Sequence, residues 1–105
     1  MRRGEVWWAD LPQPTGRRAV LILSRDKAIQ VREYVTVAEI TRTVRDIPVE
    51  VSLGLEDGLP KVCVVNLDVI NTIPKSLFSK YLSTLSLQKM MCVEEALKFA
   101  LDLRE

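Results

Sequence analysis

A chain of 105 residues with a net charge of +1, 48% hydrophobic residues and 28% charged residues has the composition of an ordinary globular domain. This composition excludes intrinsic disorder, and the longest apolar run, residues 19–23, is too short to span a bilayer. We therefore expect one domain over residues 1–105, with no membrane segment.

Residues 4–10 predict a first strand, which ends in a loop at 11–16 that is rich in proline and glycine. The next segment, 18–24, is apolar on both strand faces, which is typical of a buried strand. A polar connection with room for a helical turn covers 25–32. A third strand is predicted over 34–41, again rich in β-branched residues.

The second half continues the β pattern. Residues 47–52 alternate between apolar and polar side chains, which predicts a half-buried strand, and the proline within it indicates a sheet edge. A turn-rich connection follows at 54–60. Residues 62–66 predict a buried strand, 69–73 a further extended piece, and 79–82 a short strand.

The C-terminal part predicts a helix. Ser86 is the expected N-cap, and Glu94 precedes Lys98 by four residues, which gives a favourable surface pair. The apolar residues at helical spacing are Leu87, Met90, Met91, Leu97, Ala100 and Leu101. The fold class is therefore mainly β with α: a small, strongly bent antiparallel sheet or barrel, with a C-terminal helix packed on it as a lid.

The N-terminus and the cysteines bear on the expected compartment. Residues 1–5 lack the apolar stretch of a secretory signal, so the expected location is cytoplasmic. Cys63 and Cys92 stand in apolar surroundings without metal-ligand spacing. We expect both to be buried, reduced thiols.

Arginine is concentrated in the first part of the chain, where eight of the nine arginines fall within residues 1–45. Arg17 and Arg18 directly precede a predicted strand, and Arg42 and Arg45 follow the end of the next one. Because the planar guanidinium binds carboxylate and phosphate oxygens in pairs, these two strand ends predict one anion-binding site. Solvated or ion-paired roles are the interpretation for Arg2, Arg25 and Arg32.

The side-chain inventory limits the chemistry. The chain has no histidine, which removes the commonest general base, the Ser-His and Cys-His pairs and most zinc sites. Neither a glycine-rich phosphate loop nor a carboxylate cluster with metal spacing occurs, so we expect no cofactor and no metal. Cleavage of RNA by its own 2′-hydroxyl fits this inventory, because the substrate supplies the nucleophile.

Several segments carry a family resemblance: 3–11, 18–24, 37–41, 71–75 and 95–97. In order and content they are similar to the MazF/PemK family of toxins from bacterial toxin–antitoxin systems. The resemblance implies a small SH3-like antiparallel barrel (MazF/PemK/CcdB-like) and a homodimer. It also implies metal-independent, sequence-selective cleavage of single-stranded RNA, and inhibition by a cognate acidic antitoxin.

The same resemblance implies site residues. The family's catalytic arginine opens a strand, and here that position is Arg18; its catalytic threonine closes the pattern Ala-x-Ile-Thr, and here that is Thr41. Glu39 stands where many relatives have proline, which adds a carboxylate to the candidate site. Ala19 replaces the usual proline after the arginine. The loop at 11–17 is shorter than in many members.

Roles follow from the chemistry of these groups. Arg18 is expected to stabilise charge on the scissile phosphate, and Thr41 to donate a hydrogen bond to a phosphoryl oxygen. Glu39 or Asp10 is the candidate acceptor of the 2′-hydroxyl proton, with a salt bridge to a nearby arginine as the alternative role. Arg17 is the alternative catalytic arginine, because of the short loop before it.

Further residues are expected to contact RNA around this centre. They are Gly16, Arg17, Ser24, Arg42, Thr43, Arg45, Asn66 and Asp68. Trp7 and Trp8 are compatible with base stacking, but core or dimer contacts are the favoured interpretation. Two other classes of function stay open: a toxin of the same fold that poisons DNA gyrase by protein binding, without nuclease activity, and a degenerate binding module. Retention of both Arg18 and Thr41 favours the nuclease.

Overall fold

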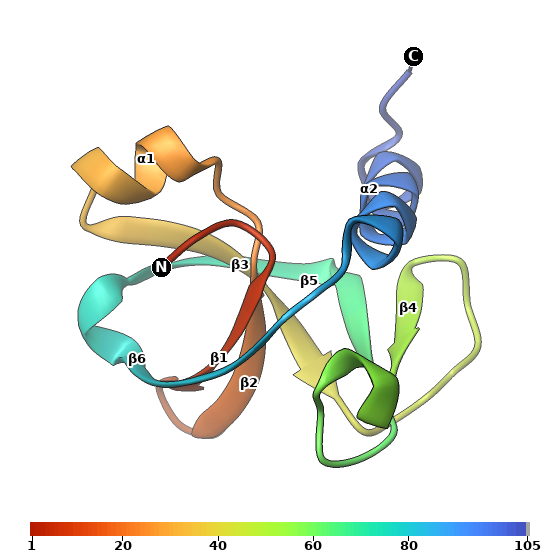
Figure 1. The fold of residues 1–105 in the computed structure, drawn as a ribbon, viewed down its shortest axis with the longest axis horizontal. Coiled ribbons are helices and arrows are strands. Elements are labelled where there is room, and N and C mark those ends of the chain that lie inside the picture. Colours follow the sequence, from red (N-terminus) through yellow and green to blue (C-terminus); the bar gives the residue numbers. More distant parts are fainter. Residues whose placement is uncertain (105) are drawn as a thin grey trace.

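The computed structural model describes residues 1–104, which form one antiparallel sheet curled into a half-barrel, with helices packed against it (Figure 1). Its elements are β1 (Glu5–Asp10), β2 (Arg17–Ile22), α1 (Asp26–Val31), β3 (Tyr34–Thr41), β4 (Glu50–Leu53), the 3-10 turn η1 (Leu55–Asp57), β5 (Cys63–Pro74), the 3-10 turn η2 (Lys75–Leu77), β6 (Phe78–Thr84) and α2 (Leu87–Leu101). The strand order is β4-β5-β3-β2-β1-β6, so β4 and β6 form the edges among the described residues. The predicted bent antiparallel sheet with a C-terminal helix is confirmed.

Strand boundaries differ from the predictions in two informative places. The prediction for 34–41 is confirmed as β3, whereas β2 begins one residue earlier than expected, so Arg17 lies within the strand. Residues 47–49 precede β4 instead of belonging to it, because the carbonyl of Ile47 accepts a hydrogen bond from the amide of Glu50 and closes a turn. The predicted edge position of this strand is confirmed.

The two extended pieces predicted at 62–66 and 69–73 are halves of one strand, β5, which is bent by a bulge. Glu39 of β3 lies opposite Asn66, but the next residue, Ala38, lies opposite Ile70. Residues 67–69 are therefore accommodated as extra length, which bends the strand and increases its twist. The first half of β5 pairs with both β3 and β4, and the second half pairs with β3.

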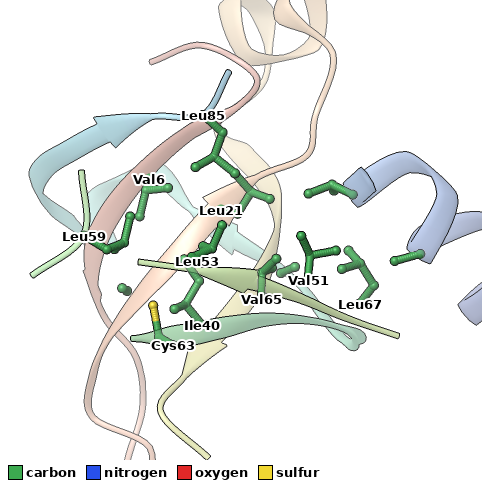
Figure 2. Packing of buried hydrophobic residues seen from close by; sticks show 14 of the residues in the cluster. Val6, Leu21, Ile40, Val51, Leu53, Leu59, Cys63, Val65, Leu67 and Leu85 are labelled. Atoms are coloured by element: carbon green, nitrogen blue, oxygen red, sulfur yellow. The ribbon is translucent and has the colours of Figure 1, made fainter. Parts of the chain in front are cut away.

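Two apolar cores lie on the two faces of this sheet. Successive residues of a strand point to opposite faces, so Leu21 packs in the first core while its neighbour Val20 packs in the second. Both side chains are fully buried. Figure 2 shows the first core, in which Leu53 of β4 packs with Leu21 and Leu67. Burial on both faces explains why the β2 segment reads as a continuous apolar run.

The helix α2 begins at the predicted N-cap: the Ser86 hydroxyl accepts a hydrogen bond from the amide of Lys89 at 3.0 Å. Its buried face is formed by Met90, Val93 and Ala96, which pack toward β4 and β5. The expectation that Leu87, Met91 and Leu101 share this face is wrong, since all three are exposed. Leu97 and Ala100 are partly buried and pack against the same core, so these two predicted residues do share the inward face. Within residues 1–104, no helix is long and apolar enough to cross a membrane.

The cysteines have different environments. Cys63 is buried in the first core, as predicted, and burial raises the pKa of its thiol, with a further increase from the nearby charge of Asp57. Cys92 is exposed, so the prediction that both thiols are buried is wrong for this one. It follows Met91 on the solvent side of α2, whereas Val93 takes the buried position.

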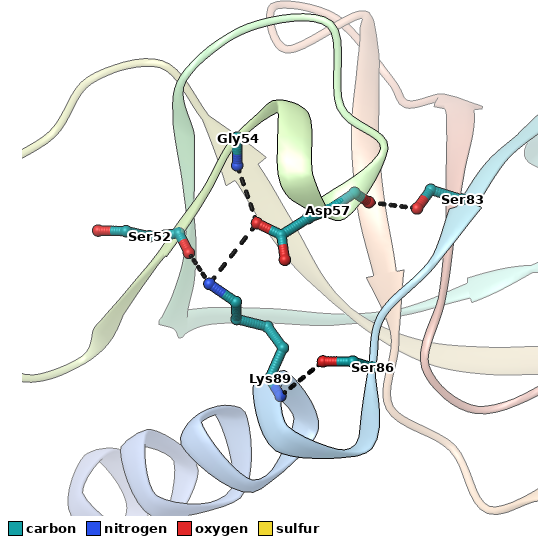
Figure 3. A network of polar contacts seen from close by, with 6 residues as sticks. All are labelled: Ser52, Gly54, Asp57, Ser83, Ser86 and Lys89. Atoms are coloured by element: carbon teal, nitrogen blue, oxygen red, sulfur yellow. Dashed lines mark hydrogen bonds and ion pairs between the residues drawn. The ribbon is translucent and has the colours of Figure 1, made fainter.

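A polar network joins the start of α2 to the η1 turn (Figure 3). The Lys89 ammonium lies 3.5 Å from the Asp57 carboxylate and donates to the carbonyl of Ser52 at 2.9 Å. The same carboxylate accepts from the amide of Gly54 at 3.0 Å, and the Ser83 hydroxyl donates to the carbonyl of Asp57. The Asp57 side chain is only 6% exposed, so this cation is its main charge compensation.

The first core predicts a large cost for truncating Leu67, which is fully buried at the β5 bulge. Leu67→Ala should lower the free energy of unfolding by about 2–5 kcal/mol, because it removes apolar contacts and leaves a cavity. Leu87→Ala is the matched control: this leucine is 87% exposed, and the change should stay within about 0.5 kcal/mol. Urea unfolding measures both, and equal losses would contradict the assigned core.

The network in Figure 3 predicts that Lys89 holds the segment that follows η1. Lys89→Met should cost about 1–3 kcal/mol, since it leaves the buried carboxylate of Asp57 without its cation. Amide hydrogen exchange should accelerate across residues 57–61. Lys80→Met, at an exposed position of β6, is the control and should leave this exchange unchanged. Unchanged amide exchange over residues 57–61 in Lys89→Met would show that the η1 turn keeps its conformation without this cation.

Candidate active site

A cleft opens where β2 and β3 part. These two strands pair from Val20–Glu39 to Ile22–Val37, but the start of β2 stays with β1 while the end of β3 stays with β5. The cleft between them has a volume of about 620 Å³. Its lining residues are Trp8, Arg17, Arg18, Ala19, Ile40, Thr41, Arg42, Thr43, Leu59, Pro60, Lys61, Cys63 and Leu82.

Arg18 and Thr41 occupy corresponding positions at the mouth of this cleft. Each lies two residues beyond the pair Val20–Glu39, on the same face of its strand as that pair. Arg18 Nη1 lies 3.2 Å from Glu39 Oε1, and the arginine side chain is 36% exposed. The Thr41 hydroxyl accepts a hydrogen bond from the amide of Thr43 at 3.2 Å, so its own hydrogen is left to donate.

Arg17 lies on the opposite face of β2, where its guanidinium carbon sits 4.7 Å from the ring centre of Trp8. This cation–π contact forms a flat, positively charged wall of the cleft. Trp7 has a different role: it packs edge-on against Phe78 and Tyr81, with ring centres 6.1 and 6.0 Å away. The interpretation of Trp7 as a packing residue is therefore confirmed, whereas Trp8 contributes to the cleft.

The segment after β3 carries Arg42 and Thr43 into the cleft lining, while Arg45 lies further along the same loop. The loop is anchored at its far end by Glu50, whose Oε1 accepts hydrogen bonds from the amides of Arg45 and Asp46, each at 2.9 Å. The second oxygen of Glu50, Oε2, is buried without a hydrogen-bond partner among the described residues. Anchoring at Glu50 fixes where the loop returns to the sheet.

The wall that faces β2 also includes residues from the 59–63 segment, which the sequence did not predict to belong to the site. Leu59, Pro60 and Lys61 follow the η1 turn that Lys89 holds from α2. A lysine in a turn-rich loop carries no local signal of a binding role, so sequence reasoning had no ground to select Lys61. The cleft lining within residues 1–104 contains three arginines and this lysine, and no acidic residue. Its field therefore favours an anion.

Besides Glu39 and Arg45, four of the predicted residues lie away from the cleft lining. Gly16 is in the left-handed conformation (φ 65°), and its carbonyl accepts from the amide of Leu11 at 3.0 Å, so it closes the loop that leads into β2. Ser24 lies beyond the other end of β2, where its hydroxyl accepts from the amide of Thr36 at 2.8 Å. Asn66 and Asp68 lie at the β5 bulge, and Asn66 Oδ1 accepts from the amide of Asp68 at 2.9 Å.

Glu39 and Asp10, the two candidate proton acceptors, differ in surroundings. Asp10 is exposed at the end of β1, opposite Arg17 in register. Glu39 is only 9% exposed, and its second oxygen accepts a hydrogen bond from Asn71 Nδ2 at 2.8 Å. The salt-bridge role is thus observed for Glu39. Among residues 1–104, no three side chains of histidine, cysteine, aspartate or glutamate gather in a way that would hold a metal ion.

Comparison with known proteins identifies the family. A family model described as "PemK-like, MazF-like toxin of type II toxin-antitoxin system" matches residues 2–101. The chain is 41% identical over 87 residues to "Probable endoribonuclease MazF2" of Mycobacterium tuberculosis, which covers 82% of this chain and 83% of that protein.

Solved structures agree with this match. The "Mycobacterium tuberculosis toxin MazF-mt6" superposes with a TM-score of 0.89 at 33% identity, covering 96% of this chain and 99% of that one. A structure described as "Endoribonuclease in complex with its cognate antitoxin from Mycobacterial species" gives a TM-score of 0.90 at 31% identity, covering 100% and 98%. The chain therefore belongs to the family of PemK-like, MazF-like toxins of type II toxin–antitoxin systems.

Proposed function

We propose that this chain is an endoribonuclease that cleaves single-stranded RNA in the cleft between β2 and β3, in a sequence-selective manner and with the substrate's own 2′-hydroxyl as nucleophile. The observation that carries the proposal is a cationic cleft without an acidic lining residue in the described chain, with Arg18 and Thr41 at corresponding positions of its mouth. The names of the relatives, which include probable endoribonuclease MazF2, support the same activity.

The proposed reaction is an internal transfer. The 2′-oxygen attacks the adjacent phosphorus, the bond from phosphorus to the 5′-oxygen breaks, and a 2′,3′-cyclic phosphate and a 5′-hydroxyl remain. One proton leaves the 2′-hydroxyl and one reaches the 5′-oxygen, so no water is consumed. Arg18 stabilises the charge that develops on the phosphoryl oxygens, and Thr41 donates a hydrogen bond to one of them. Glu39 holds Arg18 through the observed ion pair.

The remaining cations bind the flanking backbone. Arg42 and Lys61 both line the cleft, and Arg17 extends the charge along Trp8. Arginine contacts to phosphate position a strand without reading its bases, so we assign these residues to affinity and alignment. The predicted contacts of Gly16, Ser24, Arg45, Asn66 and Asp68 stay predictions.

We propose an acidic antitoxin as the protein partner. A related mycobacterial endoribonuclease is described in complex with its cognate antitoxin. Guanidinium groups accept carboxylates as well as phosphates, so an acidic segment fits the same cleft. The homodimer implied by the resemblance stays a prediction; the exposed apolar side chains Met91 and Phe99 of α2 are compatible with an assembly that covers them.

The mechanism predicts RNA cleavage in the presence of EDTA, with 5′-hydroxyl products. Arg18→Ala should lower kcat by a factor of about 10² to 10³, because one charge-stabilising donor is lost. Thr41→Val should lower it less. End analysis of the cleaved RNA and single-turnover rates measure these effects. Arg18→Ala also leaves the barely exposed carboxylate of Glu39 without its cation, so its melting temperature should fall, and the rates are compared well below that temperature.

Two controls separate this mechanism from its competitors. A substrate with 2′-deoxyribose only at the cleaved position should resist cutting. Arg17→Ala should weaken RNA binding and lower kcat less than Arg18→Ala does. If Arg17→Ala lowers kcat more than Arg18→Ala, the catalytic role belongs to Arg17. Dependence on added Mg²⁺, or 5′-phosphate products, would overturn the proposed chemistry.

The shared anion site predicts competition between antitoxin and RNA. An acidic peptide from the cognate antitoxin, labelled with a fluorophore, should be displaced by an all-deoxy single-stranded oligonucleotide, and its binding should weaken as salt is raised. Arg42→Ala should weaken both ligands, because this side chain lines the cleft. Simultaneous binding without loss of affinity would indicate that the antitoxin inhibits from a separate surface.

A further inference from the structure

Glu39 is held from both sides by two neighbouring strands. Its Oε1 lies 3.2 Å from Arg18 Nη1 of β2, and its Oε2 accepts a hydrogen bond from Asn71 Nδ2 of β5 at 2.8 Å. The glutamate is 9% exposed, whereas Arg18 is partly exposed and Asn71 is exposed. The two partners therefore fix a carboxylate that solvent barely reaches.

The β5 bulge makes this arrangement possible. Glu39 lies opposite Asn66, and without the bulge the residue opposite Val37 would be Asp68, whereas the extra length places Asn71 there. Val37 and Glu39 point to the same face of β3, because they are two residues apart. Asn71 thus stands diagonally next to Glu39 on the face that also carries Arg18.

The ion pair between Arg18 and Glu39 is made at one point. The guanidinium fork and a carboxylate favour two parallel hydrogen bonds. Here the pair joins Nη1 to Oε1, and the amide of Asn71 occupies the oxygen that a second parallel bond would use. Because the Asn71 amide is neutral, it holds the Glu39 carboxylate and leaves the ion pair with Arg18 in place.

We infer that Asn71 is a positioning residue of the Arg18 site: it holds Glu39 in a one-point pair with Arg18, and so keeps the other guanidinium donors available for the scissile phosphate. This inference rests on the proposed function for the identity of that phosphate. Without Asn71, the carboxylate is free to turn and close on the fork of Arg18 with both oxygens. Arg18 then carries a bound carboxylate where the substrate phosphate belongs.

The kinetic consequence is specific. Arg17, Arg42 and Lys61 still bind flanking phosphates, so Asn71→Ala should lower kcat about tenfold and leave KM within about a factor of two. In a Glu39→Gln background, Asn71→Ala should lower kcat by less than about twofold further, because a glutamine amide has one acceptor oxygen and cannot close on the fork. A structural role for Asn71 would lower kcat equally in both backgrounds.

Thr72→Ala is the matched control. Thr72 neighbours Asn71 on β5 and exchanges a hydroxyl hydrogen bond with Thr36 at 2.9 Å, on the opposite face of the strand. This change removes a cross-strand contact of the same kind and should leave kcat and KM unchanged. Asn71→Ser serves as a second truncation of the same side chain. Asn71→Ala and Asn71→Ser should both melt close to the unchanged protein, because position 71 is exposed.

A measurement without RNA tests the inference apart from the activity. The ¹⁵N signals of the Arg18 Nη atoms, assigned by their loss in Arg18→Ala, should be averaged by rotation in the unchanged protein. They should become distinct in Asn71→Ala, because a two-point pair stops that rotation. Unchanged Arg18 signals in Asn71→Ala, or equal kinetic losses with and without Glu39, would overturn the inference. If the Arg18 signals become distinct in Asn71→Ala but the unchanged protein does not cleave RNA, the positioning role of Asn71 is supported and the proposed function is overturned.

Discussion

The bulge in β5 is the constraint on which the rest of the molecule depends. Residues 67–69 add length between two pairings with β3, and this forces the strand to bend. The bend directs the first half of β5 toward β4 and lets Leu67 fill the first core. It also brings Asn71 beside Glu39. Shape, core and site geometry thus share one irregularity in one strand.

The separation of β2 from β3 creates the cleft in which the candidate active site lies. Strands that stayed paired to their ends would satisfy each other's backbone groups and leave no cleft. Here each strand follows a different neighbour, so the side chains at their ends face open space instead of a partner strand. The helix α2 contributes from a distance, since Lys89 holds the turn that leads into the opposite wall.

The sequence predicted the parts of this structure that depend on local pattern. The β3 segment, the Ser86 cap and the buried β2 run follow from periodicity and capping chemistry, and strand-end arginines indicated an anion site. The union of two predicted pieces into β5 was missed, because a bulge interrupts alternation in the same way that a loop does. Lys61 and Asn71 join the site through tertiary placement. Lys61 stands in a turn-rich loop without a motif, and Asn71 opens the family-like segment 71–75, which does not indicate a contact with Glu39.

The position of the site between two adjacent strands of the sheet also limits what enters it. The cleft is walled by β2 on one side and by β3 with the 59–63 segment on the other, and its volume is about 620 Å³. A double helix keeps its bases paired and turned inward, whereas the bases of a single strand can be splayed out into such a cleft. If the proposed function holds, discrimination against paired RNA thus follows from the concave shape of the site, before any base is read.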